Sequence, residues 1–148
     1  MQAAIQHDPQ SADLRTDLGL LRLATGDISG AMTILQEASQ LEPANPRAQA
    51  ALVSTLLQEG KFEAALGKLE GLEKRTIQEP ELYTLRGRAY LGKGDRQQAR
   101  ANFEKALAIS PTYLPAATRL AYLDVEANNM PAARKRFESI IAIDKENV

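Results

Sequence analysis

The sequence predicts an all-α solenoid, in which antiparallel helix hairpins stack one after another. The first observation is a glycine period of 34 residues, since Gly26, Gly60 and Gly94 are followed at the next step by Asn128. The second is that an alanine series and a series of large apolar residues keep the same period: Ala31, Ala65, Ala99 and Ala133, and Leu35, Leu69, Phe103 and Phe137. A fixed period of this length is typical of helical repeat architectures.

The first helix of each repeat is clearest in the third frame. Tyr83, Gly87 and Tyr90 recur there at spacings of three and four residues, and Gly94 then interrupts the pattern. Glycine suits the left-handed residue just past a helix C-terminus, and asparagine is the next best residue for it. We therefore expect this helix to end before Gly94, and its counterpart in the fourth frame to end before Asn128.

The second helix of each repeat has its own start and stop signals. We expect Asp27, Asp95 and Asn129 to cap the N-termini, because their side-chain oxygens can accept from free backbone N–H groups. Pro43 and Pro111 stop the helices before them. The frames run without insertion over 12–45, 46–79, 80–113 and 114–147, and we take residues 1–148 as one array.

Small residues on facing helices allow the two helices of each hairpin to pack closely. Gly19, Gly87 and Ala121 share one position of the first helix, and the alanine series shares one position of the second. Such side chains let two helices approach closely. A single hairpin could not bury its apolar face, so neighbouring repeats must stack to cover it.

On these residues the chain resembles the tetratricopeptide repeat (TPR) family along its whole length. The third frame carries the family pattern most fully: Tyr83, Gly87, Tyr90, Gly94, Ala99, Phe103, Ala106 and Pro111. The resemblance implies a right-handed superhelix that binds proteins. The second frame departs from the pattern, with Arg75 in place of an apolar residue and Ile77 in place of the proline.

Composition excludes several other classes. Eighteen Lys and Arg against nineteen Asp and Glu give a formal charge of -1, which offers no basic field for nucleic acid. No apolar run is long enough to span a bilayer. The chain has no cysteine, and His7 is its only histidine, so thiolate metal sites, most zinc sites and histidine-dependent nucleophiles lack their residues. We expect no enzyme activity and no cofactor.

A looser resemblance concerns the subfamily. The stretches 90–95, 99–107 and 132–138 resemble long bacterial TPR proteins of the PEP-CTERM/exosortase system. That resemblance implies a lipid-anchored envelope protein tied to protein sorting and exopolysaccharide production. A cytoplasmic location is the alternative, because nothing in residues 1–148 addresses the chain to a compartment.

The ends of the pattern predict further contacts. Residues 1–11 correspond to the tail of a preceding hairpin, which indicates a fragment of a longer array. The last helix offers Phe137, Ile140, Ile141 and Ile143 without a polar cap after it. We expect this end to pack on another copy in a head-to-tail contact.

In TPR arrays the first helices line a concave groove that holds peptides, and the groove positions carry over residue by residue. The candidate partner-binding residues are Thr16, Leu20, Ser54, Thr84, Arg88, Arg119 and Tyr122. Acidic groups lie mainly in the first repeat, at Asp13 and Asp17, whereas Arg88 and Arg119 lie in the last two. This distribution could orient a ligand with charges at both ends.

Arg88 and Tyr122 occupy the same repeat position one unit apart and form the most distinctive pair. Arginine can clamp a carboxylate and an aromatic ring can anchor an apolar side chain. The alternative is that Arg88 is a solvated charge and Tyr122 packs against the next repeat. A stripe of Leu23, Leu57, Leu91 and Val125 is read as inter-helix packing rather than ligand contact.

The clamp of chaperone-tail-binding TPR domains does not fit. Its positions hold Thr16, Leu20, Ala51, Glu81 and Leu85 in the first three frames, and Ala50, Ser54, Leu85, Pro115 and Arg119 in the last three. Only Arg119 matches. The function predicted is therefore a scaffold that binds some other peptide or protein in the groove. The alternative is a structural array segment that mediates assembly without a ligand of its own.

Overall fold

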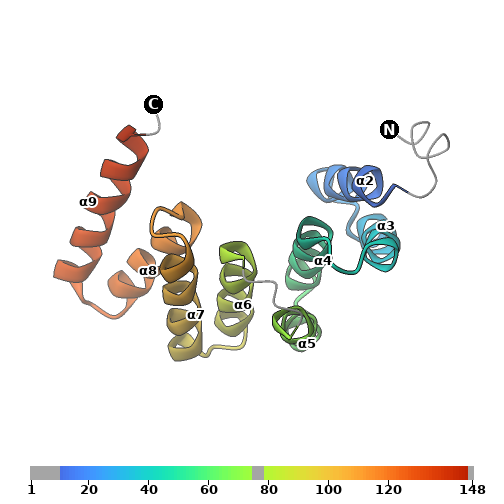
Figure 1. Ribbon diagram of the computed structural model, residues 1–148. Coiled ribbons are helices and arrows are strands. Elements are labelled where there is room, and N and C mark those ends of the chain that lie inside the picture. Colours follow the sequence, from blue (N-terminus) through green and yellow to red (C-terminus); the bar gives the residue numbers. More distant parts are fainter. Residues whose placement is uncertain (1–10, 75–78, 147–148) are drawn as a thin grey trace. The chain divides into compact units, whose positions relative to one another are not determined.

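The computed structural model describes residues 11–74 and 79–146, and these residues form eight α-helices and no strand (Figure 1). The predicted all-α fold of helix hairpins is confirmed. The helices are α2 (Ala12–Ala24), α3 (Ile28–Leu41), α4 (Pro46–Gln58), α5 (Phe62–Glu73), α6 (Pro80–Gly92), α7 (Arg96–Ile109), α8 (Leu114–Glu126) and α9 (Met130–Glu146).

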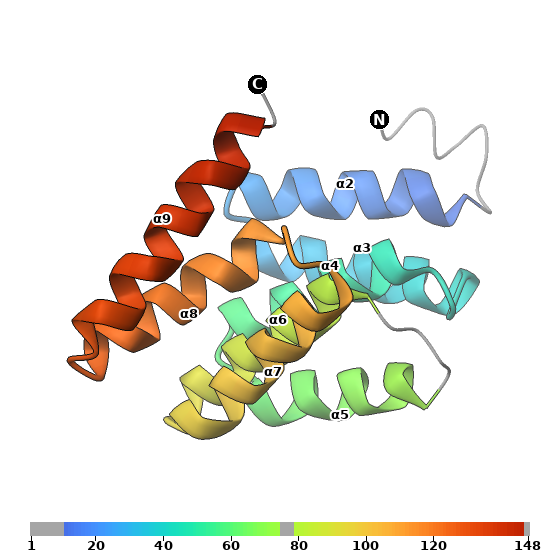
Figure 2. The same cartoon turned by 60° about the vertical axis from the view of Figure 1, so that its left-hand side comes forward.

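The helix starts repeat the period of the sequence. The first helices of the hairpins begin at residues 12, 46, 80 and 114, and the second helices begin at 28, 62, 96 and 130. Consecutive helices pack as pairs, which is plain for α2 with α3 and for α6 with α7 in Figure 2. A period of 34 residues thus sets both helices of each hairpin.

Each hairpin turn uses a residue with positive φ. Gly26, Gly60 and Gly94 lie at φ 82°, 71° and 81°, and Asn128 takes the same place at φ 56°. In every case the next residue donates its N–H to a carbonyl five residues back at 2.9 Å, as Asp95 does to Tyr90. These bonds form a Schellman motif that satisfies the last carbonyls of the helix. The predicted helix ends are therefore confirmed.

The predicted caps of the second helices are also confirmed. Asp27 accepts from the N–H of Gly30 at 2.9 Å, Asp95 from that of Gln98 at 3.0 Å, and Asn129 from that of Ala132 at 3.3 Å. Lys61 precedes α5 without a side-chain cap. The caps fix where α3, α7 and α9 begin.

The chain divides into two compact units, Met1–Ile77 and Gln78–Val148, each with its own core. Unit one buries Ala31 and Leu35 of α3 against Ala51 and Leu52 of α4. Unit two is built around six buried residues of α7 and α8: Ala99, Phe103, Ala106, Ala116, Leu120 and Leu123. Repeat stacking therefore takes place inside each unit.

The small residues do what the sequence predicts. A Cβ on Gly19 would lie 2.5 Å from Leu35 Cγ, and a Cβ on Gly87 would lie 2.4 Å from Phe103 Cε1. The large side chain of the second helix thus rests directly on the backbone of the first. The predicted tail of a preceding hairpin falls mainly on residues 1–10, and Arg75 and Ile77 on 75–78, outside the described residues.

Candidate functional site

A hollow of about 510 Å³ opens between α6 and α8 in unit two. Helix α6 contributes four of its residues, α8 contributes four, and the loop before α8 contributes one. The lining residues are Glu81, Thr84, Leu85, Arg88, Tyr113, Pro115, Thr118, Arg119 and Tyr122. Four of the seven candidate partner-binding residues, namely Thr84, Arg88, Arg119 and Tyr122, thus lie in one concavity.

The repeat period explains why these side chains converge. The α6 residues recur at helical spacing over two turns, from Glu81 to Arg88, so they share one face of the helix. The α8 residues occupy the same four positions one period later, from Pro115 to Tyr122. Because α6 and α8 are equivalent helices in contact with one another, equivalent faces border one hollow.

Arg88 and Arg119 provide the positive end of this hollow. Half-burial of the Arg88 guanidinium, together with repulsion from the charge of Arg119, lowers the pKa of Arg88 from its usual value. Among the described side chains of residues 11–74 and 79–142, none forms an ion pair with Arg88 or Arg119. Six other arginines do form ion pairs there: Arg15, Arg22, Arg47, Arg96, Arg100 and Arg136. The carboxylate of an external ligand could therefore pair with these two guanidinium groups.

Glu81 and Tyr113 lie toward the other end. Burial raises the pKa of the Tyr113 phenol, and the nearby carboxylate of Glu81 raises it further. Glu81 stands in the first turn of α6, seven residues before Arg88, so about 10 Å of helix axis separates the two. The sequence predicted acidic groups in the first repeat and arginines in the last two repeats, whereas Glu81 and both arginines lie in one hollow of unit two.

Tyr122 combines exposure with a fixed orientation. Its side chain is 57% exposed, and its ring meets Phe137 of α9 edge to face, with centroids 6.0 Å apart at 85°. The ring therefore packs against the second helix of its own hairpin. Such a T-shaped contact holds an aromatic ring in place and leaves a face available to a ligand.

The candidate residues of the first repeat lie elsewhere. Thr16 is fully buried, and its hydroxyl donates to the Ala12 carbonyl at 2.8 Å, so it is not on the surface where a partner could lie. Leu20 packs against the core of unit one, and Ser54 on α4 is half-buried. Sequence position alone placed these residues in the groove, but only the packing decides whether they reach its surface.

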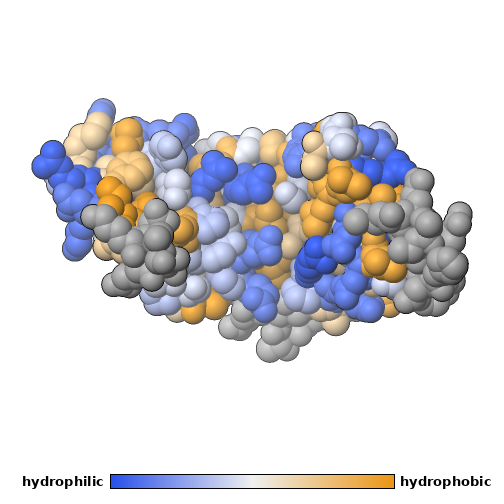
Figure 3. Space-filling model, turned by 90° about the horizontal axis from the view of Figure 1, so that it is seen from above, coloured by the Kyte–Doolittle hydropathy of each residue, from blue (hydrophilic) through white to orange (hydrophobic). Residues whose placement is uncertain are grey.

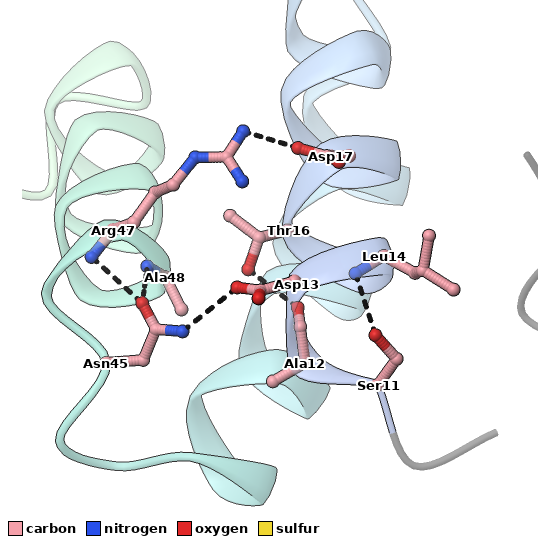
Figure 4. Close-up of polar contacts among 9 residues, drawn as sticks. All are labelled: Ser11, Ala12, Asp13, Leu14, Thr16, Asp17, Asn45, Arg47 and Ala48. Carbon is pink, nitrogen blue, oxygen red and sulfur yellow. Dashed lines mark hydrogen bonds and ion pairs between the residues drawn. The ribbon is translucent and has the colours of Figure 1, made fainter. Parts of the chain in front are cut away.

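The acidic side chains of the first repeat are occupied by neighbours (Figure 4). Asp17 forms an ion pair with Arg47 at the start of α4. Asp13 accepts a hydrogen bond from the Asn45 amide at 3.2 Å, while Asn45 also caps α4. These carboxylates therefore fasten α2 to α4 and are less available to a ligand than the sequence predicts.

The leucine stripe was correctly interpreted as packing for three of its four members, of which Leu57 is buried at 9% exposure. Leu23 packs against the core of unit one and Leu91 against that of unit two, whereas Val125 is 36% exposed. Two residues of the hollow were not placed in the groove from the sequence, namely Pro115 and the aromatic residue Tyr113. The only signal for Tyr113 is an aromatic side chain one residue before the first helix of a repeat, at the N-cap position of α8.

Two other hollows are smaller or already occupied by internal bonds. One of about 430 Å³ in unit one is bordered by Gln49, whose amide donates to Ser39 at 2.8 Å and to the Pro43 carbonyl at 3.1 Å. Another of about 350 Å³ lies among α7, α8 and α9 and is lined by Lys135 and Arg136. Among the described residues, neither hollow brings together two cations without an ion pair, as Arg88 and Arg119 do in the α6–α8 hollow.

In the described part of the chain, no group of three or more His, Cys, Asp or Glu side chains could hold a metal ion. None of the helices from α2 to α9 has the length and apolarity to cross a membrane.

Comparisons with known proteins agree with the repeat geometry. A family model described as tetratricopeptide repeat matches residues 22–89 and 90–147. The BBSome complex member BBS4 of Bos taurus is 29% identical over 108 residues, which is 73% of this chain and only 21% of BBS4. The chain thus spans about a fifth of that relative.

Solved structures share the fold at low identity. A thermophilic TPR protein of Thermus thermophilus, TTC0263, superposes with a TM-score of 0.80 and 23% identity, over 91% of this chain and 75% of that one. A chain of the APC/C hetero-tetramer Cut9–Hcn1 gives a TM-score of 0.86 and 16% identity, over 97% of this chain and 28% of that one.

Proposed function

The chain belongs to the tetratricopeptide repeat family, a family of protein-interaction scaffolds, and we propose that its second unit binds an acidic segment of a partner protein in the α6–α8 hollow. The observation that carries this proposal is the pair of arginines, Arg88 and Arg119, which face one hollow and have no carboxylate partner among the side chains that the structure describes. A bound carboxylate would relieve their mutual repulsion. Arginine is also well shaped to grip it through two parallel hydrogen bonds.

The rest of the hollow supports a peptide rather than a lone anion. Tyr122 and Pro115 are exposed, and Tyr113 is half-buried, so apolar side chains beside the acidic residue would find aromatic and proline surface. Thr118 adds a hydroxyl on the same face. Aromatic and arginine side chains are the residue types that most often dominate binding energy at protein interfaces.

Glu81 gives the proposed ligand a direction. It lies about 10 Å along the helix from Arg88, and an extended peptide advances about 3.3 Å per residue. A ligand with an acidic residue at the arginine end would therefore place a residue three positions away near Glu81. A basic residue at that place completes the charge match.

A peptide titration tests the proposal. Fluorescein-labelled octapeptides would carry one Glu beside a Leu. They would also carry one Lys placed one to five positions from that Glu, on its N-terminal side in one series and on its C-terminal side in the other. Fluorescence polarisation should show the tightest binding when Lys is three positions from Glu. Replacement of Glu by Gln should weaken binding about tenfold or more, since hydrogen bonds to charged groups contribute roughly 1.5–3 kcal/mol.

Four variants separate the contribution of the hollow from that of the rest of the surface. Arg88→Met and Tyr122→Ala should each weaken the best peptide, while Arg134→Ala, an exposed arginine of α9 outside the hollow, should leave its affinity unchanged. Binding that survives both Arg88→Met and Arg119→Met would reject the site. In that case the alternative, an array segment without its own ligand, becomes the better account.

The names of the relatives support a role in assemblies. BBS4 is a member of the BBSome complex, and the chain superposed above comes from the APC/C hetero-tetramer Cut9–Hcn1. By analogy, the ligand for this hollow is a segment of another protein rather than a metabolite, and no catalytic step is proposed.

The sequence also supports a proposal about the biological setting that is more specific than a role in protein assemblies. The stretches 90–95, 99–107 and 132–138 favour the bacterial PEP-CTERM/exosortase system and the cell envelope. Fractionation of a bacterium expressing the tagged gene product tests this setting, because an envelope location supports it and a purely cytoplasmic one contradicts it.

A further inference from the structure

The α6–α8 hollow presents two positive charges to one ligand. Arg88 of α6 and Arg119 of α8 both line it, and no described side chain forms an ion pair with either. Burial of Arg88, and after it the charge of Arg119, lower the pKa of Arg88. A side-chain carboxylate carries a single negative charge, so it would neutralise only one of the two arginines. A ligand group with two negative charges would neutralise both.

A free hydroxyl group lies on the same helix face as Arg119. Threonines occupy one repeat position in α2, α6 and α8, namely Thr16, Thr84 and Thr118. The hydroxyls of Thr16 and Thr84 donate to the carbonyl four residues earlier, at 2.8 Å and 2.9 Å. The Thr118 hydroxyl forms no hydrogen bond within the part of the chain that the structure describes, and its side chain lines the hollow. It is therefore available to donate to a ligand, whereas the hydroxyls of its two equivalents are engaged.

We infer that the acidic residue taken by this hollow is a phosphorylated serine or threonine of the partner protein, held by Arg88, Arg119 and Thr118. This inference rests on the proposed function and names the chemistry of its ligand. A phosphate monoester carries a charge of about −1.5 to −2 at pH 7 and has three strong acceptor oxygens. Two guanidinium groups and one hydroxyl match that group in charge and in donors, whereas a carboxylate offers two oxygens and one charge.

The acidic end of the hollow is compatible with a phosphate at the arginine end. Glu81 lies about 10 Å along the helix axis from Arg88, and salt screens exposed charges beyond roughly 8 Å at physiological ionic strength. The raised pKa of Tyr113 keeps its phenol neutral, so this side chain adds no negative charge. The two arginines would contact the phosphate directly, and their attraction therefore outweighs the repulsion from Glu81.

Hydrophobic contacts favour a phosphorylated protein segment over free phosphate. Tyr122, which is 57% exposed, and the exposed Pro115 border the same hollow and offer apolar surface to side chains next to the phosphorylated residue. Figure 3 shows hydrophilic and hydrophobic side chains interspersed over one face of the molecule. A mixed surface of this kind is typical of interfaces that form and dissociate. Phosphorylation of the partner would then switch binding on, and removal of the phosphate would switch it off.

Four versions of the best octapeptide test the inference, with Glu, Gln, phosphoserine or serine at the acidic position. Fluorescence polarisation should show that the phosphoserine peptide binds at least about tenfold more tightly than the Glu peptide, because the second guanidinium also gains hydrogen bonds to a charged group. A phosphoserine peptide that binds no more tightly than the Glu peptide overturns the inference. The proposed function survives that result if the Glu peptide still binds better than the Gln peptide. Equal binding of all four peptides rejects the site itself.

Substitutions in the hollow should reduce the preference for phosphoserine over Glu, whereas a defect of folding alone would weaken both peptides equally. Arg88→Met and Arg119→Met should each bring the ratio of the two affinities close to one, because a single arginine remains to be neutralised. Thr118→Val should lower the ratio severalfold. Thr84→Val is the matched control and should leave the ratio unchanged, since its hydroxyl is bonded to the Pro80 carbonyl. A ratio that stays the same in all three hollow variants contradicts the inference.

The second ionisation of the phosphate provides an independent measurement. Its pKa is about 6, whereas that of a glutamate side chain is about 4.3. Affinity for the phosphoserine peptide should therefore fall from about pH 7.5 to about pH 5.5, because the monoanion neutralises only one arginine. The charged and titratable side chains that line the hollow are Glu81, Arg88, Tyr113 and Arg119. The Glu peptide controls for their titration, and an equal pH dependence of both peptides would count against recognition of the second charge.

Competition with inorganic phosphate distinguishes the two sources of the phosphate group. Inorganic phosphate should displace the phosphoserine peptide only in large excess, since it makes no contact with Tyr122 or Pro115. Displacement by an equal concentration of inorganic phosphate would indicate a site for the free anion and would overturn a phosphorylated protein segment as the ligand.

Discussion

At the scale of single residues, Gly87 shows how the repeat is held together. A Cβ at this position would overlap the ring of Phe103 at 2.4 Å, and Phe103 is fully buried. Gly87→Ala should therefore lower the free energy of unfolding by about 1–3 kcal/mol, because the ring cannot move without disturbing the core. Urea denaturation followed by circular dichroism measures the change.

Gly67 is the matched control for that substitution. It lies inside α5, and a Cβ there would meet no atom within 4 Å. Gly67→Ala should raise the free energy of unfolding by roughly 0.5–1 kcal/mol, since alanine is the better helix former. Equal effects of the two substitutions would show that close helix contact is not what position 87 requires.

Arg88 is expected to lower the stability of the fold and to contribute to ligand binding. Its half-burial and the nearby charge of Arg119 lower its pKa, so the folded state disfavours the charged form at every pH below that pKa. Neutral pH lies in this range, and removal of the charge should stabilise the fold. We expect Arg88→Met to raise the melting temperature by about 1–2 °C, given that a partly exposed charge contributes at most about 1 kcal/mol.

The same variant should bind the best acidic peptide at least about tenfold more weakly. Differential scanning fluorimetry and peptide polarisation together provide the measurement, with Arg134→Met as the control for losing an exposed arginine of α9. A variant that loses stability along with affinity would mean that Arg88 supports the fold, not the ligand.

At the scale of helices, Asp124 joins three elements of unit two. Its buried carboxylate on α8 forms ion pairs with the guanidinium of Arg100 of α7, at an N–O distance of 2.7 Å, and with that of Arg136 of α9, at 2.6 Å. Burial raises the pKa of Asp124, but the hydrogen bonds and charges of Arg136 and Arg100 outweigh it, and the net pKa is lowered. The ion pairs therefore contribute stability that is present above the unfolded-state pKa and lost as pH falls through the folded-state pKa.

Asp124→Asn should reveal that contribution. At pH 7 we expect it to lower the free energy of unfolding by about 1–3 kcal/mol, less than for a fully buried pair because both arginines are about a third exposed. Below about pH 4 the difference from the parent protein should shrink, since the parent carboxylate then begins to protonate. A difference that is constant from pH 7 to pH 3 would contradict this account.

Features encoded locally were predictable from the sequence. Gly94 and Asn128 end their helices because few residues accept positive φ, and Asp95 caps α7 because its side chain reaches the next turn. The Asp124 network was not predictable, since it needs side chains from three helices to meet. The same reason explains the hollow. The repeat period placed Arg88 and Tyr122 on the right face, but it could not tell that Thr16 is buried.

At the scale of the whole molecule, the chain divides into two compact units. The first two repeats belong to the first unit, and the proposed binding site belongs to the second. All nine residues that line the hollow belong to Gln78–Val148, whereas Gly19 packs on Leu35 in Met1–Ile77. We therefore expect Gly19→Ala to destabilise unit one, by about 1–3 kcal/mol, without changing the affinity of the acidic peptide. Stability in repeat proteins is roughly a sum of repeat and nearest-neighbour contributions, so a defect in one unit need not reach the other.

The measurement combines urea denaturation with peptide polarisation on the same samples. At a urea concentration where Gly19→Ala has lost part of its helical signal, peptide affinity should still equal that of the parent protein. Gly87→Ala is the counterpart, because it loosens the helix pair that carries Glu81 and Arg88, and it should weaken peptide binding at the same urea concentration. Binding that declined equally in both variants would mean that the hollow depends on the first unit, and the site would then have to be sought across more of the array.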